Sequence, residues 1–161
     1  MFVVSLSKNK LRKAFFTALT VVALSLLTVL LINVIGSVQA LQTSGGVSLS
    51  ANRAQERLSF ISHYGWEVDE EPVEIREVII PEVFDDVYQN YNKIQLEQGF
   101  NLEKFAGQRV KCWTYVVRNY PGTTPEDDYI RLNMLVSDGV IIGGDVCSVK
   151  LDGFMHGFYK D

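Results

Sequence analysis

The chain has 161 residues, 47% of them hydrophobic, with nineteen acidic against fifteen basic residues and a formal net charge of −4. The first thirty-five residues hold four of the basic residues and none of the acidic ones, so the remainder has a formal charge of −8. That sign disfavours nucleic acid and anionic lipid as partners of the remainder. The length that follows the first fifty residues is enough for one small domain.

The first element in chain order is an apolar run from residue 14 to residue 35 without a charged side chain. At about 1.5 Å per residue a helix of this length spans roughly 33 Å, enough to cross a hydrocarbon core of about 30 Å. Four basic residues directly precede the run, and such residues stay on the cytoplasmic side. We therefore predict a cytoplasmic stub at 1–13, a single transmembrane helix at 14–35 and an extracytoplasmic remainder at the cell membrane.

A cleavable signal peptide is the alternative to a retained anchor. Residues 38–40 offer small or apolar side chains at the spacing that signal peptidase requires, and cleavage after Ala40 would give a secreted protein. The apolar core of a signal peptide is about 7 to 15 residues long, so the longer run here favours the anchor. Residues 36–50 are uncharged and rich in Gly and Ser, which predicts a flexible tether before a domain at 51–161.

Two helices are predicted in this domain. The first begins near Asn52, which with Gln55 resembles a capping box, and it ends at Gly65. The second begins at Pro81, a residue suited to the first turn of a helix, and it ends at Gly99. Its predicted buried stripe consists of Val83, Val87, Tyr91 and Ile94.

A strand is predicted around residues 73–80, and a three-stranded antiparallel meander in the last third of the chain. Its first two strands span 109–119 and 129–136, and a three-residue loop, 137–139, leads to a third strand that begins with Val140 and pairs it with Val136. If Asn119 faces Tyr129, the apolar residues of all three strands line up on one face. Two helices that cover this one face would complete an α+β domain.

Cys112 and Cys147 are predicted to be free thiols. An extracytoplasmic location by itself favours a disulfide. In the expected register, however, the two cysteines lie about 23 Å apart along the strands and point to opposite faces. Cys112 is then a small core residue.

The other face of the meander gathers the candidate binding residues. An aromatic pair lies beside an amide and a charge pair, in which Arg131 is expected directly across from Asp145. Such a surface suits a peptide, a saccharide or an envelope protein. Cross-strand pairs of this kind are more often structural, and Gly143 with Gly144 more often marks a bulge or a close backbone approach. The predicted binding residues are Trp113, Tyr115, Arg131, Asn133, Gly143 and Asp145.

Catalysis has weaker support in the sequence. Cys147, His156 and Asp152 are the residue types of a thiol-dependent hydrolase, but closeness in sequence does not place them in contact. His63 and His156 belong to no ligand-spaced cluster, and we predict neither a metal nor another cofactor. The hypothesis is a non-enzymatic binding module at the cell envelope. A thiol hydrolase and a sensor or regulator of a membrane partner are the alternatives.

Six motifs follow one another along the domain: YGWEV (64–68), IPE (80–82), YQNYN (88–92), NYPG (119–122), IGGDVCS (142–148) and DGFMHG (152–157). Together they resemble domain-of-unknown-function family 4830. The resemblance covers roughly residues 51 to 158 and implies a small protein of Gram-positive bacteria, with one membrane span followed by this domain. It implies no activity, and it makes the neighbourhood of the Gly-Gly-Asp strand end and of the C-terminal tail the first place to look for a site.

Overall fold

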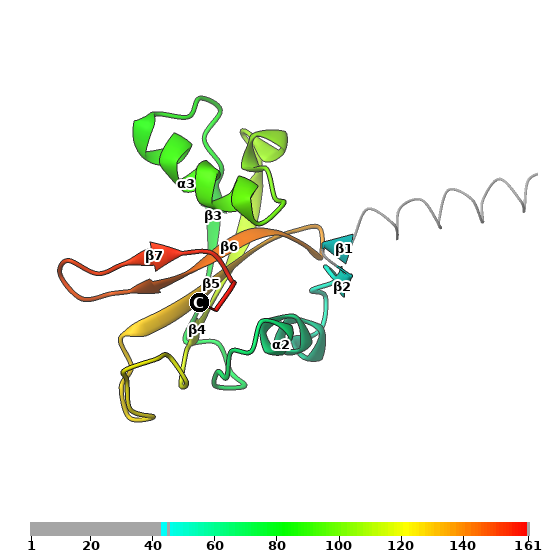
Figure 1. Ribbon diagram of the computed structural model, residues 1–161. Coiled ribbons are helices and arrows are strands. Elements are labelled where there is room, and N and C mark those ends of the chain that lie inside the picture. The colour runs from blue at the N-terminus through cyan, green and yellow to red at the C-terminus, as the bar shows by residue number, and fades with distance from the viewer. Residues whose placement is uncertain (1–42, 45, 161) are drawn as a thin grey trace, which may run out of the picture. The chain divides into compact units, whose positions relative to one another are not determined.

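The computed structural model describes residues 43–44 and 46–160. The predicted stub, the predicted transmembrane helix and most of the predicted tether lie outside these residues, as does the possible cleavage site at Ala40. Among the residues described, no helix combines the length and the apolar character needed to cross a membrane. The described part is an α+β domain, as predicted (Figure 1).

A five-stranded antiparallel sheet with the order β3-β4-β5-β6-β7 forms the centre of the domain. The predicted meander corresponds to its three middle strands, and one further strand lies at each side. The strands are β3 (Glu74–Ile79), β4 (Arg109–Val116), β5 (Ile130–Ser137), β6 (Val140–Ser148) and β7 (Met155–His156). The other elements are β1 (Thr43–Ser44), β2 (Val47–Ser48), α2 (Ala54–His63), α3 (Asp86–Glu97) and the short 3-10 helix η1 (Leu102–Phe105).

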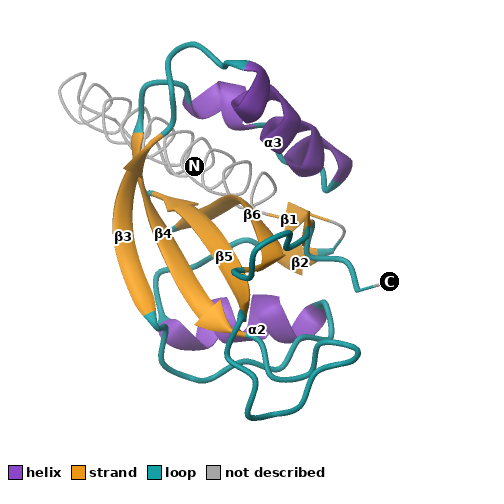
Figure 2. Ribbon diagram, turned by 90° about the vertical axis from the view of Figure 1, so that its left-hand side faces the viewer, coloured by secondary structure: helices purple, strands orange, loops and turns teal. Residues whose placement is uncertain are grey.

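The two helices lie on opposite faces of the sheet, which corrects the prediction that both cover one face (Figure 2). Phe60 of α2 belongs to the same core cluster as Tyr115 of β4. Tyr88 of α3 packs against a second cluster that includes Cys112 of β4 and Leu102 of η1. Adjacent residues of the central strands are therefore buried on alternate sides.

The register between β4 and β5 differs by one residue from the prediction. Val116 pairs with Arg131, where the prediction paired it with Leu132. The prediction aligned apolar side chains as though one face of the sheet were buried. Because both faces are covered, either register gives buried apolar residues, and the apolar pattern does not choose between them.

The connection between β5 and β6 is a two-residue turn and not the predicted three-residue loop. Asp138 and Gly139 have φ values of 48° and 77°, as a type I′ turn requires. A bulge at Ile142 of β6, opposite Leu135 and Val136, adds another residue to the offset. Met134 therefore pairs with Gly144, where the prediction paired it with Ile142.

Both cysteines are free, as predicted, but the geometric reason is different. Cys112 pairs with Leu135, and Cys147 pairs with Arg131 four residues along the same strand. An even separation places both thiols on the same face, so the prediction of opposite faces is wrong. The two thiols are separated by two strand spacings across the sheet and by about 13 Å along the strands, which is too far for a disulfide.

The folded domain begins before the predicted boundary at residue 51. Val47 and Leu49 are only 9% and 7% exposed and belong to the core cluster beside α2. The carbonyl of Leu49 accepts a hydrogen bond of 2.8 Å from the amide of Ile141. The end of the predicted tether is thus part of the domain.

The first helix starts one residue later than the predicted capping box. Arg53 is its N-cap, and Glu56 accepts a hydrogen bond of 3.2 Å from the Arg53 amide. The Ser50 hydroxyl donates a second bond of 2.7 Å to Glu56. These bonds, led by that of Ser50, lower the pKa of Glu56 to about 2. The pair predicted from Asn52 and Gln55 does not cap the helix.

Candidate functional site

A groove of about 440 Å³ lies between α3 and the sheet. All five strands of the sheet contribute to it, because it crosses them beneath the helix. Its polar side chains include Asn133, Asp145 and Arg76, and its apolar walls come from both the helix and the sheet. The remaining lining residues are Val78, Val87, Tyr88, Asn90, Tyr91, Ile94, Cys112, Leu135 and Met155.

Helix α3 is attached to the sheet through buried amide side chains. The side-chain oxygen of Gln95 accepts a hydrogen bond of 2.8 Å from the amide of Gly144. The side-chain nitrogen of Gln98 donates a bond of 3.1 Å to the carbonyl of the same glycine. The predicted apolar stripe is wrong at two positions, because Val83 and Val87 are 83% and 74% exposed. Those valines are free to meet another surface.

Two glycines of β6 permit close approaches to the strand: Gly143 that of α3, and Gly144 that of Phe158. A Cβ atom on Gly143 would lie 2.7 Å from the side-chain oxygen of Gln95. A Cβ atom on Gly144 would lie 2.3 Å from the ring of Phe158. The structural interpretation of this pair, a bulge or a close backbone approach, is confirmed. Gly143 lies against α3 and does not line the groove.

A chain of hydrogen bonds runs along the polar floor of the groove. The Tyr91 hydroxyl donates to one oxygen of Asp145 at 2.9 Å, and the Asn133 side chain donates to the other at 2.9 Å. The Thr114 hydroxyl donates to the side-chain oxygen of Asn133 at 2.8 Å. Asp145 is only 2% exposed. Both of its oxygens have a donor, as a buried carboxylate requires.

The site disfavours the ionised forms of three groups, because it raises the pKa of each of them. Burial raises the pKa of Asp145 above its usual range. Burial, together with the nearby Asp145, raises the pKa of Tyr91 well above its usual value and that of Cys147 to about 12. The side-chain nitrogen of Asn133 lies 3.5 Å from Cys147 Sγ. At neutral pH Cys147 is therefore a thiol and a weak nucleophile.

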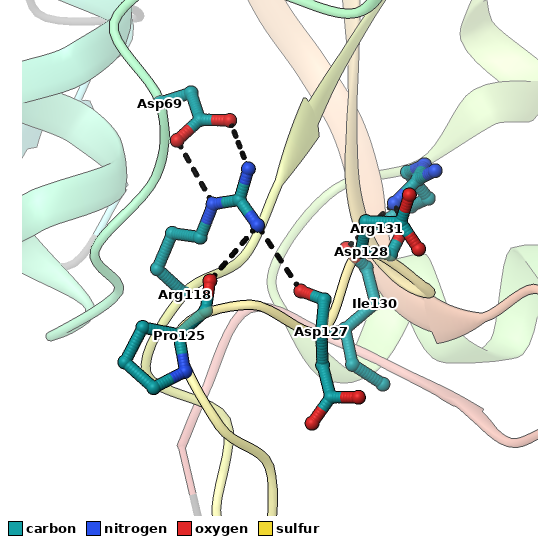
Figure 3. A network of polar contacts seen from close by, with 7 residues as sticks. All are labelled: Asp69, Arg118, Pro125, Asp127, Asp128, Ile130 and Arg131. Carbon is teal, nitrogen blue, oxygen red and sulfur yellow. Dashed lines mark hydrogen bonds and ion pairs between the residues drawn. The ribbon is translucent and has the colours of Figure 1, made fainter.

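The structure brings together two of the predicted binding residues, Asn133 and Asp145. Arg131 lies on the same face, but it pairs with Cys147 and not with Asp145. Its guanidinium donates to the backbone carbonyls of Asp128 and Ile130 (Figure 3). The expected charge pair across the strands is therefore absent.

The loop between β4 and β5 is held by Arg118 (Figure 3). Its guanidinium donates two hydrogen bonds to the carboxylate of Asp69, at 2.9 and 2.6 Å. It also reaches the carbonyls of Pro125 and Asp127 at 3.1 and 3.2 Å. The bond to Arg118 lowers the pKa of Asp69. These contacts tie the connection between β4 and β5 to the segment that contains Asp69.

Trp113 and Tyr115 lie on the opposite face of the sheet and take no part in the groove. Arg57 of α2 donates a hydrogen bond of 3.0 Å to the Tyr115 hydroxyl. The guanidinium carbon of Arg57 lies 3.6 Å from the centre of the Trp113 ring. These contacts connect α2 to the sheet. Trp113 and Tyr115 thus have the structural role that is the alternative to binding for the predicted set.

The residues of the thiol-hydrolase alternative are not assembled. Val146 pairs with His156, so the His156 side chain lies on the face opposite to that of Cys147. His156 stacks on Phe154 and lies 3.3 Å from the Tyr120 hydroxyl. Asp152 is exposed in the turn before β7. Within the described part of the chain, no group of three or more His, Cys, Asp or Glu residues could hold a metal ion.

Sequence reasoning did not assign Tyr88 and Tyr91 to a site. Their spacing of three residues places them on one side of α3, and this signal could have indicated a shared surface. The apolar-stripe interpretation counted Tyr91 as core only. No partner for its hydroxyl follows from the sequence, because the predicted arrangement places no helix over the face of the sheet that carries Asp145.

Comparison with known proteins found one family. A family model described as "Domain of unknown function (DUF4830)" matches residues 60–146. The matched segment contains α3 and the groove residues Tyr91, Asn133 and Asp145, and it ends before Cys147. The motif at 152–157 lies outside it. No curated protein and no solved structure matches the chain.

Proposed function

This chain belongs to the family described as domain of unknown function DUF4830, a membership that assigns no activity, and we propose that the domain is a binding module. Its binding surface is the groove between α3 and the sheet. The partner is a polypeptide segment of another protein of the cell envelope, whose apolar side chains enter the groove.

The observation that carries this proposal is the combination of an ordered polar floor with an exposed apolar rim. Tyr91, Asp145 and Asn133 hold one another in place before any partner arrives. At the rim, Val87 and Met155 are 74% and 48% exposed. Burial of such surface contributes roughly 25 cal/mol per Å², and the ordered floor lowers the entropic cost of binding.

Binding is better supported than thiol chemistry. A nucleophilic cysteine needs a lowered pKa or a neighbouring base. The pKa of Cys147 is raised to about 12, and His156 lies on the other face of the sheet. The groove therefore offers a surface for recognition without an assembled nucleophile and base.

The proposed location is the outer side of the cell membrane, with the chain anchored through residues 14–35. The uncharged apolar run and the basic residues before it support this orientation. Protease added to intact cells should digest the domain while leaving a small membrane-bound fragment. A full-length chain that stays intact until the cells are lysed would contradict the orientation.

The binding proposal is tested by capture of partners from solubilised membranes with the full chain and two variants. Val87→Asp places a charge on the apolar rim of the groove, whereas Leu151→Asp alters an apolar residue that is 96% exposed and outside the groove. We expect quantitative mass spectrometry to show partners that Val87→Asp loses and Leu151→Asp keeps. Equal capture by both variants, or equal loss, would refute the groove as the binding surface.

A further inference from the structure

Strand β3 is an edge of the sheet that is well suited to pairing. In the part of the chain that the structure describes, β3 pairs with β4 on one side only. Ile75 and Ile79 are 53% and 58% exposed, and Val73, just before the strand, is 52% exposed. An edge strand with exposed β-branched residues and no proline is a template for another strand.

The free edge and the groove are parts of one surface. Arg76 and Val78 of β3 line the groove on the face of α3. Ile75 and Ile79 alternate with them and lie on the opposite face. A strand added to β3 would therefore place alternate side chains beside the groove and beside the two isoleucines.

Charge indicates which kind of strand would fit. Residues 67–86 contain nine carboxylates and one basic residue, Arg76. Glu74 and Glu77 lie on β3 itself, and their ion pairs with Arg76 and Arg109 are exposed. The acidic surroundings disfavour an acidic strand and a second copy of this domain, and they favour a basic one.

We propose that β3 accepts an extended segment of the partner, in which basic residues alternate with apolar ones, as an additional strand of the sheet. Backbone hydrogen bonds to β3 supply the affinity, and the groove with the two isoleucines selects the side chains. The inference rests on the proposed function and specifies the class of partner.

Hydrogen exchange of the full chain in detergent micelles tests this pairing. The probe is a peptide of about eight residues in which lysine and valine alternate, and its control has the same charge but two prolines that prevent strand pairing. We expect the alternating peptide to slow exchange of the β3 amides about tenfold and the proline peptide to leave it unchanged.

Three results would overturn the proposal. The first is unchanged hydrogen exchange of the β3 amides with the alternating peptide, and the second is equal slowing of that exchange by both peptides. The third is exchange that slows as protein concentration rises in the absence of peptide, which would show that a second copy of the chain pairs with β3. The double variant Ile75→Lys, Ile79→Lys should abolish the slowing, whereas Leu151→Lys should keep it. These measurements use neither Val87→Asp nor captured partners. The pairing proposed for β3 can therefore be refuted while binding in the groove is still supported.

Discussion

The hydroxyl of Tyr91 donates a hydrogen bond of 2.9 Å to the carboxylate of Asp145 and so joins helix α3 to strand β6 at the floor of the groove. Tyr91 also lies beside the exposed rim residue Val87 on the same helix. The position of the helix, and with it the shape of the groove, depends in part on this buried contact.

Removal of the Tyr91 hydroxyl should destabilise the domain. In Tyr91→Phe one oxygen of the buried Asp145 loses its donor, and the free energy of unfolding should fall by about 1 to 3 kcal/mol. Urea unfolding of the full chain in micelles, followed by tryptophan fluorescence, measures this. Tyr88→Phe is the matched control, since no hydrogen bond of its hydroxyl is described, and it should cost less than about 0.5 kcal/mol. Equal losses in both variants would contradict the proposed role of the contact.

The stability of Asp145→Asn relative to the parent chain should rise with pH. Burial raises the pKa of Asp145 in the folded state, so between the unfolded value of about 3.9 and the folded value the native protein binds more protons than the unfolded one. The contribution of Asp145 to the free energy of unfolding therefore falls as pH rises through that interval. Asp145→Asn does not undergo this loss. The difference in free energy of unfolding between the variant and the parent chain should therefore level off above the folded pKa of Asp145.

Asp69→Asn provides a control of opposite sign for this pH series. The bond from Arg118 lowers the folded pKa of Asp69, so its stabilising contribution is present above about pH 3.9 and is lost as the pH falls through the folded value. The stability of this variant relative to the parent should decrease as pH rises. Urea midpoints at several pH values would compare the two, and parallel curves would show that Asp145 is not the titrating group.

Cys147 should react slowly with alkylating reagents. Its pKa of about 12 leaves little thiolate at pH 8, so labelling should be at least about a hundredfold slower than that of a free cysteine. The measurement uses Cys112→Ala, so that Cys147 is the only thiol in the chain. Adding Asp145→Asn removes the charge that helps to raise the pKa and should accelerate labelling. Rapid labelling of Cys147 in the single variant would revive the hydrolase alternative.

Gly144→Ala should be strongly destabilising. The new Cβ atom would lie 2.2 Å from the carbonyl oxygen of Asn133 and 2.3 Å from the Phe158 ring, so backbone or core must shift at a cost of about 3 kcal/mol or more. Gly122→Ala is the control, because its Cβ would meet open space and only its φ of 80° is unfavourable, which costs about 1 to 2 kcal/mol. Thermal unfolding of both variants measures these losses. A smaller loss in Gly144→Ala than in Gly122→Ala would be inconsistent with the close approach of β5 and Phe158 to Gly144.

Local patterns in the sequence predicted much of the fold. The alternation of residues within β4 and β5, the glycine that follows each helix and the α+β class are confirmed. The alternation predicted for β6 is broken at the bulge, where Ile142 lies on the face opposite to that of Val146. These features depend on contacts between residues close in the chain, and such contacts leave a regular spacing in the sequence. The free thiols were also predicted, although on the wrong geometric argument.

The predicted site was only partly recovered, because it depended on strand register. A shift of one residue moved Trp113 and Tyr115 to the face of α2 and left Asn133 and Asp145 beneath α3. The shift was invisible in the apolar pattern because both faces of the sheet are buried.

By itself the sequence determined the charge of the domain, the positions of most elements and the uncharged apolar run that precedes them. Only the tertiary structure decided which face each helix covers and where the groove lies. The physical reason is that α3 is attached by hydrogen bonds between the side-chain amides of Gln95 and Gln98 and the backbone of Gly144, far away in the chain. Such contacts follow no period in the sequence, because the partner of each amide is a backbone group that every residue carries.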